Sequence, residues 1–529
     1  MTAVARTLAD RRSLVAFWLG AAVVSVGVLM HLPMYMMAAD MGYRLAGMAM
    51  DAGMYVGMAL IVGGVAMTGY GLLPRKMAAF PAGPREVFSP PEEAPLTRAH
   101  WTVMIVLALA LIIDIMKPAS LGFVTPGMRE EYGVDAATVA ALPSAALTGT
   151  TIGSFVWGAL ADIYGRRATI LLSSILFVGT AICGAMPSFG WNVFMCFLMG
   201  AAAGGMLPVA YALLAEIMPT RHRGWALVLV GGVGAVGGYL AASLFSELLQ
   251  PIFGWRAMWF LNFPTGLLVI GLSAWIPESA RFLQHVGRID EARAILKRFG
   301  AVVIGVEEPA EAHDRHAPLP PVDARYLGVT AALTAAALAW GLVNFGLLLW
   351  LPGALVGEGL SVGAASGLIT KSSLVAAPVI AVATLMYSRW STKWSLAAML
   401  GIVIAGLAAL LLRRADVAAT ASPLIPVSLL IVGASGAIAI LLPYTAEVYP
   451  LHIRGRAAGW VAGCSKLGGL IAQGISLLIG APALGAAAAL IAGPAVLALA
   501  LIGRFGPETR GLDLRAVDQA RADLRPPQV

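Results

Sequence analysis

The chain has 529 residues, of which 59% are hydrophobic and only 12% are charged. Soluble domains carry about 25% charged residues, so this composition excludes an ordinary soluble protein and predicts a polytopic α-helical membrane protein. The formal net charge of +7 does not indicate nucleic-acid binding, because the Lys and Arg residues fall in short segments between apolar runs, where they orient a membrane protein.

The first two apolar runs, residues 13–37 and 48–72, form a pair that precedes the rest of the chain. The first run follows several arginines like a signal peptide, but it is longer and lacks a small-x-small cleavage site, so we expect a retained helix. A Pro-rich polar stretch, "PAGPREVFSPPEEAPLTRAH", follows. These features predict an N-terminal membrane hairpin over residues 1–80 and a cytoplasmic linker over 81–100.

The hairpin is rich in methionine and contains "MHLPMYMM" at residues 30–37. Met and His can bind copper(I), whereas Met also simply fills apolar packing faces. Because only one His and no thiolate are nearby, we predict no metal site and no cofactor.

Twelve further runs follow, six on each side of a charged segment. They lie at 101–127, 137–160, 168–186, 191–215, 224–247 and 256–276, and at 327–352, 363–388, 394–412, 422–446, 457–480 and 483–503. The sequence thus predicts fourteen membrane helices, with six-helix bundles over 101–276 and 326–503 and a tail over 504–529. In the segment 277–325, "RIDEARAILKRF" places Ile289, Ala292, Leu296 and Phe299 on one helical face, which predicts a cytoplasmic amphipathic helix.

The charges of the connecting segments predict the orientation. Basic pairs such as Arg166–Arg167 and Arg454–Arg456 recur in every second connection, and the others hold few, with Arg413–Arg414 as a local exception. This asymmetry predicts that both termini are cytoplasmic, in a bacterial inner membrane.

The chain also repeats itself. "YALLAEIMPTRHRGW" begins at Tyr211 and matches "YTAEVYPLHIRGRAAGW", which begins at Tyr444; "PES" at 277–279 corresponds to "PET" at 507–509. The two bundles are therefore halves of one ancestral unit, and parallel halves with a binding site between them are typical of transporters. We count Tyr211 and Tyr444 among the candidate binding residues.

Ionisable residues within the spans are the main candidates for a functional site. Asp114 lies thirteen residues after Trp101, about 20 Å into the bilayer, and Lys117 shares its helix face. Lys371 and Lys466 also fall about ten residues into their runs. Such residues are costly in lipid and usually face a polar cavity or a partner.

Two interpretations of these residues remain open. Asp114 and Lys117 can be a purely structural pair, although this leaves Lys371 and Lys466 unexplained. Alternatively, three lysines against one aspartate suit an anionic solute, with Asp114 as the candidate proton carrier. By the repeat, Asn344 occupies the place of Asp114, and Trp340 near it suits a flat or apolar solute.

A further motif, "GALADIYGRRATIL" at 158–171, joins the second and third runs of the first half. It resembles the loop signature of the major facilitator superfamily, and "AEIMPTRHRG", "AEVYPLHIRG", "PESARFL" and "PETRGLDL" resemble signatures of its sugar-porter and metabolite–proton symporter branches. The resemblance implies two six-helix bundles, alternating access and an ion-pair network that closes the cytoplasmic gate. Its implied members are Asp162, Arg166, Arg167, Glu216, Arg223, Glu278, Glu447 and Arg454.

Some positions depart from the family pattern. Cys196 stands where many proton-coupled relatives carry an Arg, and the loop "YSRWSTKWS" of the second half has no acid, so the gate is expected to be lopsided. The glycine pattern from Gly232 to Gly237 lies in mid-span, so we interpret it as helix packing and not as a nucleotide site.

We therefore predict a proton-coupled secondary transporter of a small organic acid, supported by "WGLVNFGLLLWLP", which resembles helix 7 of metabolite–proton symporters. Export of amphipathic compounds and a transport-inactive membrane sensor are the alternatives. An enzyme is not expected, because no nucleophile–base or metal cluster occurs. The expected partners are an anionic solute, protons and the lipid bilayer, and we expect a monomer that does not bind nucleic acid.

Overall fold

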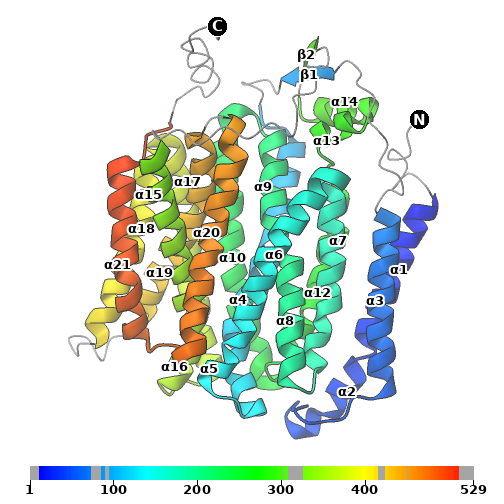
Figure 1. Ribbon diagram of the computed structural model, residues 1–529, viewed down its shortest axis with the longest axis vertical. Helices are drawn as coiled ribbons and strands as arrows, with labels where there is room; N and C mark the ends of the chain where they lie inside the picture. Colours follow the sequence, from blue (N-terminus) through cyan, green and yellow to red (C-terminus); the bar gives the residue numbers. More distant parts are fainter. Residues whose placement is uncertain are drawn as a thin grey trace.

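The computed structural model describes residues 11–72, 85–89, 95–300, 302–307, 326–414, 423–449 and 451–510. Within them, fourteen helical segments are long and apolar enough to cross a membrane, which confirms the predicted number and the all-α membrane fold. In Figure 1 these segments run alongside one another, and both strands lie at one end. We call this end the basic end, because helices begin there beside Arg166, Arg221 and Arg454; the other is the opposite end.

The N-terminal hairpin consists of α1 (Arg11–Leu29), α2 (Leu32–Met37), η2 (Ala39–Met41) and α3 (Ala52–Leu72). Helices α1 and α3 touch through glycines, since a side chain at Gly20 would collide with the backbone at Gly64. His31, the residue considered for metal binding, is buried between these helices, and its Nδ1 lies 2.8 Å from the carbonyl oxygen of Gly27. The hairpin packs beside the first bundle, against α7 (Arg166–Gly179).

A buried ion pair fastens the hairpin to the first bundle at the opposite end. The Arg256 guanidinium donates to Glu131 at 2.7 Å, and both side chains are almost fully buried. The same carboxylate accepts the backbone N–H groups of Leu45 and Ala46, in the loop between η2 and α3, at 2.6 and 2.9 Å. The hairpin is thus tied to α4 and to the segment after α10 by charge-assisted hydrogen bonds.

The two bundles repeat one arrangement. The first contains α4 (Arg98–Tyr132), α5 (Ala136–Val139), α6 (Ala141–Tyr164), α7, η3 (Thr180–Ala185), α8 (Phe189–Ala203), α9 (Met206–Ile217), α10 (Thr220–Phe253), α11 (Ala257–Phe260), α12 (Asn262–Leu272) and η4 (Ser273–Trp275). The second contains α15 (Leu327–Gly341), η6 (Leu342–Leu347), α16 (Leu348–Gly357), α17 (Val362–Arg389), α18 (Thr392–Arg414), α19 (Leu424–Val448), α20 (Leu451–Ile479) and α21 (Leu484–Phe505). Helix α4 packs on α10 as α15 packs on α20, and α6 packs on α8 as α17 packs on α19.

The halves meet along α10 and α17 and along α6 and α20. The glycine-rich run of α10 makes this possible, because Gly232 faces Ile380 of α17 while Gly234 and Gly237 face Leu111 and Ile112 of α4. A larger side chain at these positions would hold the helices apart, so the packing interpretation of this pattern agrees with the structure.

The linkers contain elements that the sequence analysis did not predict. Strand β1 (Arg85–Ser89) pairs antiparallel with β2 (Val302–Glu307), with Arg85 opposite Glu307. The β-branched residues of "VVIGVE" favour this extended form. The predicted amphipathic helix corresponds to α14 (Ile289–Arg298), which follows α13 (Ala280–His285); Ala292 and Phe299 are buried, whereas Ile289 is exposed.

Candidate functional site

The Asp114–Lys117 pair lies inside the first bundle, on α4. Its charged atoms are 3.6 Å apart and both side chains are buried. The ammonium of Lys117 lies over the ring of Phe177 from α7, 3.2 Å from the ring centroid, which adds a cation–π contact. Pro118 follows directly inside α4, and a proline has no N–H to donate to the carbonyl four residues earlier, which is that of Asp114.

Asp114 is not fully satisfied by this pair. Its buried Oδ1 faces the Lys117 ammonium at 3.6 Å, which is longer than an ordinary hydrogen bond. A Coulombic interaction links it to Lys466 of α20, in the other half of the protein. Lys466 is half-buried in α20. Asp114 of the first half thus interacts electrostatically with Lys466 of the second half, whereas the Lys117 ammonium packs on α7 within the first bundle.

Asn344 and Trp340 belong to the second half, and Asn344 contacts α10 of the first half. Asn344 belongs to η6, the π-helical segment that joins α15 to α16. Such segments are frequent at functional sites. The Tyr239 hydroxyl of α10 lies 3.1 Å from the Asn344 carbonyl oxygen and 3.2 Å from its side-chain oxygen. The Trp340 indole N–H donates to Ala434 at 2.8 Å, so its polar atom is already used.

Three sequence candidates lie elsewhere. Tyr211 lies at the middle of α9 and packs its hydroxyl against Gly231 of α10. Tyr444 is fully buried and donates to the carbonyl of Pro507 at 2.5 Å, which places it with the residues of the basic end. Lys371 does not join the buried charges: it lies on an exposed stripe of α17 together with Leu374, Val375 and Val382.

The depth of Lys371 explains its exposed position. Trp390, also exposed, is typical of a residue at a membrane interface, and Lys371 precedes it by nineteen residues. At 1.5 Å per residue this is about 28 Å, close to the whole hydrocarbon thickness of about 30 Å. The lysine can therefore extend its ammonium to the water at the opposite end. The sequence analysis counted residues from the predicted start of this helix, and it therefore placed Lys371 too deep in the membrane.

The first half carries an ionic network at the basic end. Arg166 contacts Asp162 at 3.0 Å and Glu216 at 3.6 Å. Glu278 accepts the N–H of Arg166 at 2.7 Å and so caps the start of α7. Burial raises the pKa of Glu278, and the backbone N–H donors oppose that rise. Ser279 donates to Glu216 and joins the two acids.

At the basic end of the second half, hydroxyl groups occupy most of the places that charged groups occupy in the first half. Glu508 accepts the N–H of Thr392 at 2.9 Å and its hydroxyl at 2.6 Å, and it also accepts the Ser391 hydroxyl. Burial acts to raise the pKa of Glu508, but these hydrogen bonds outweigh it and lower the pKa to about 2. Thr509 donates to Glu447 at 2.7 Å. Glu508 and Thr392 were not among the sequence candidates, although the match of "PET" to "PES" pointed to Glu508.

The remaining gate candidates also lie at the basic end. Arg167 donates its N–H toward Glu278 at 3.4 Å. Arg454 donates its Nε–H to the Tyr449 carbonyl at 3.3 Å. Arg223 lies one residue before Gly224, where α10 approaches Glu447 and Tyr387 of the other half. Cys196 is fully buried within α8.

Contacts between the halves also occur at the opposite end. Ser246 of α10 and Ser366 of α17 are hydrogen-bonded at 2.7 Å, and Gln250 of α10 donates to the Ser246 hydroxyl at 2.7 Å. The backbone of α4 at Gly122 lies against Leu349 of α16. These contacts hold the two halves together on the side away from the ionic networks.

Known proteins share both the sequence pattern and this arrangement. The family profile described as Major Facilitator Superfamily matches residues 103–473. The chain is 26% identical over 402 residues to the niacin transporter NiaP of Acinetobacter baylyi, covering 72% of this chain and 87% of that protein. It is 29% identical over 416 residues to the 4-hydroxybenzoate transporter PcaK of the same organism, covering 73% and 86%.

Among solved structures, the fold is similar to that of the xylose transporter XylE of E. coli in a partially occluded inward-open conformation. The TM-score is 0.61 at 17% identity, and the match covers 79% of this chain and all of the other. The matched portions leave the N-terminal hairpin outside the family profile, which begins at residue 103.

Proposed function

Because the chain belongs to the Major Facilitator Superfamily, we propose that it is a secondary active transporter that carries a small organic acid together with protons by alternating access. The observation that carries this proposal is the buried Asp114–Lys117 pair of the first half together with the electrostatic interaction of Asp114 with Lys466 of the second half. Transporters of this architecture bind their solutes between the two repeats, near the middle of the membrane.

These charges favour an anionic solute. Asp114 and Lys117 balance each other, so Lys466 adds one positive charge in excess. A carboxylate bound beside Lys466 would complete the balance, and an ionised hydrogen bond of this kind contributes about 1.5–3 kcal/mol. The relatives named for niacin and 4-hydroxybenzoate both transport aromatic compounds, which supports an aromatic acid as the first solute to test.

Asp114 is the candidate proton carrier. Its buried Oδ1 lies 3.6 Å from the Lys117 ammonium, longer than an ordinary hydrogen bond, so a proton bound there would weaken this ion pair without breaking a short hydrogen bond. Protonation of Asp114 would remove its attraction to Lys466, and Lys466 would then be available to the solute anion. This exchange would couple proton binding to solute binding through one pair of charges.

The networks at the basic end are proposed as the cytoplasmic gate. The gate residues contact neighbouring helix ends and not the central charges, so they would bias the conformations without touching the solute. We place both termini and the basic end in the cytoplasm of a bacterial inner membrane, with the chain as a monomer. The domain boundaries predicted above, 1–80, 81–100, 101–276, 277–325, 326–503 and 504–529, are part of this proposal.

Uptake into proteoliposomes tests the proposal. With an acid-outside gradient, the protein should accumulate 4-hydroxybenzoate or niacin in a saturable way, and an uncoupler should abolish accumulation. The uncharged analogues 4-hydroxybenzamide and nicotinamide should be neither carried nor competitive. Uptake of the amides as fast as the acids would contradict an anion site.

A pair of lysine variants locates the anion site. Lys466→Gln should weaken solute binding about tenfold or more, because one ionised hydrogen bond is lost. Lys371→Gln is the matched control, since this lysine is also within a span but lies on the exposed stripe of α17, and it should bind as the parent does. Equal affinities for all three proteins would remove Lys466 from the site.

A further inference from the structure

His31 is a buried imidazole at the junction of α1 and α2, and it uses only one of its two nitrogens. Its side chain has no exposed surface. The Nδ1 atom lies 2.8 Å from the carbonyl oxygen of Gly27. Because a carbonyl oxygen only accepts hydrogen bonds, Nδ1 carries the proton, and Nε2 of the neutral ring keeps its lone pair. This Nε2 is also buried, and it has no hydrogen-bond partner among the described residues.

Metal-binding histidines adopt the same arrangement. Their second ring N–H usually donates to a backbone carbonyl or a carboxylate, and this bond fixes the tautomer and the orientation of the ring toward the ion. A histidine that serves only the packing of two helices is expected to use both nitrogens, since a buried polar atom without a partner costs free energy. The unused Nε2 of His31 therefore indicates a ligand.

Two methionines of α3 flank the imidazole. The ring of His31 lies directly against the backbone of α3 at Gly57, where any side chain would collide with it. Met54 and Met58 stand three residues before and one residue after Gly57, and their i,i+4 spacing puts both on one face of the helix. Met54 is fully buried and Met58 is half-buried. An imidazole and two thioethers form a neutral, soft ligand set, which suits Cu(I).

A negative charge near the site favours a cation. Asp51 accepts the N–H of Met54 at 2.8 Å at the start of α3, and it also interacts electrostatically with His31. The described residues contain no group of three or more His, Cys, Asp or Glu side chains that could hold a metal, which disfavours Zn(II) here. The sequence analysis predicted no metal site because it found one His and no thiolate, but a soft monovalent ion accepts a smaller ligand set that includes thioethers.

We propose that His31, Met54 and Met58 bind a soft monovalent cation, Cu(I) or its analogue Ag(I), between α1 and α3. The imidazole comes from the end of one helix and both thioethers come from the other, so the bound ion would clamp the two helices of the hairpin together. This inference goes beyond the proposed transport function and does not depend on it.

The surroundings of the site offer further thioethers on the side from which an ion would arrive. Ten of the 23 methionines of the chain lie between Met30 and Met67. Three of them, Met36, Met37 and Met41, are exposed at the opposite end, beside α2 (Figure 1). Exposed thioethers there would hold a soft ion transiently before it reaches the buried imidazole.

Titration of the purified full chain with Ag(I), in the absence of solute, tests the site. Calorimetry gives the affinity, and elemental analysis after gel filtration gives the number of bound ions. The three buried thiols can also take up Ag(I), so the result is the difference between variants. His31→Leu and the double variant Met54→Leu/Met58→Leu should each lose one ion, with an affinity weakened more than tenfold. Cu(I) kept reduced by ascorbate should compete for this ion, whereas Zn(II) should not.

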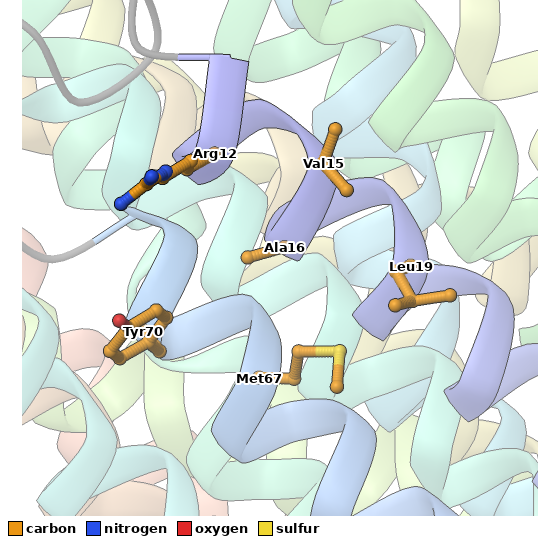
Figure 2. A pocket seen from close by; sticks show the side chains of 6 residues that line it. All are labelled: Arg12, Val15, Ala16, Leu19, Met67 and Tyr70. Carbon is orange, nitrogen blue, oxygen red and sulfur yellow. The ribbon is translucent and has the colours of Figure 1, made fainter.

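The matched control is Met67→Leu. Met67 lies nine residues beyond Met58 on α3, about 13 Å along the helix axis, and lines a surface pocket with Ala16 and Leu19 (Figure 2). This variant should bind as the parent does. Equal Ag(I) binding by the parent and His31→Leu, or equal losses in Met67→Leu and the double variant, would refute the site. If His31→Leu does not fold, the comparison of the double variant with Met67→Leu still decides, because Leu and Met have similar volumes.

Discussion

The buried pair on α4 gives the most decisive prediction, because its structural and functional interpretations differ in a double variant. At 3.6 Å and an effective dielectric constant of about 20, the attraction between Asp114 and Lys117 is about 4–5 kcal/mol. Removal of one partner of a buried pair leaves an uncompensated charge and typically costs 3–5 kcal/mol. Asp114→Asn and Lys117→Met should therefore each destabilise the protein by about that amount. The effect can be measured by unfolding in mixed detergent–SDS micelles.

The double variant Asp114→Asn/Lys117→Met should recover most of this stability, since no unpaired charge remains and Met fills the space under Phe177. Its transport activity then separates the two interpretations. If the pair is only structural, restored stability should restore gradient-driven uptake. If Asp114 carries the proton, the double variant should be stable but unable to accumulate solute against a gradient, while still exchanging labelled for unlabelled solute. A stable double variant that accumulates solute normally would refute the assignment of Asp114.

Four further predictions follow from the described contacts. Asp162→Asn should slow transport strongly but leave solute binding close to that of the parent, as judged by binding to detergent-solubilised protein. Glu508→Gln should lower the thermal stability at pH 7. Because the folded-state pKa of about 2 lies below the ordinary 4.5, this difference should shrink as the pH falls below about 4.5 and be absent near pH 2. Arg256→Met should cost about 3–5 kcal/mol and release the hairpin, seen as faster proteolysis of the loop around Leu45. Gly200→Val should block folding, since its side chain would collide with the backbone of α6, whereas Gly401→Ala, which faces open space, should be tolerated in expression and gel filtration.

The membrane spans could be predicted closely from the sequence because each one is set by length and hydropathy alone. For example, the predicted run 256–276 corresponds to Ala257–Trp275 in the structure, and the run 363–388 corresponds to Val362–Arg389. The internal repeat also predicted that the two bundles share one arrangement, because both halves bury the same kind of small residues. The family match confirms the fold and the prediction that the chain is not an enzyme.

The direction in which a side chain points within a span was harder to predict. The α17 sequence is apolar nearly all round, so its hydropathy does not indicate which face meets lipid, and Lys371 was counted with the binding residues for this reason. Tyr444 was placed in the site because it opens a repeated segment, but its depth along α19 puts it against Pro507. The cation–π contact of Lys117 with Phe177 depends on how α7 packs against α4, which no local pattern reveals.

The two networks proposed as the cytoplasmic gate differ in the kind of bond that holds them. In the first half a guanidinium, Arg166, bridges Asp162 and Glu216, and this contact weakens with salt because Asp162 is exposed. In the second half the hydroxyl of Thr392 stands in the corresponding place, and neutral hydroxyls donate to Glu508 and Glu447. These bonds respond to protonation of the acids but little to salt. The lopsided gate that we propose thus has a physical form: Arg166 forms ion pairs in the first half, whereas hydroxyl groups donate to Glu508 and Glu447 in the second half.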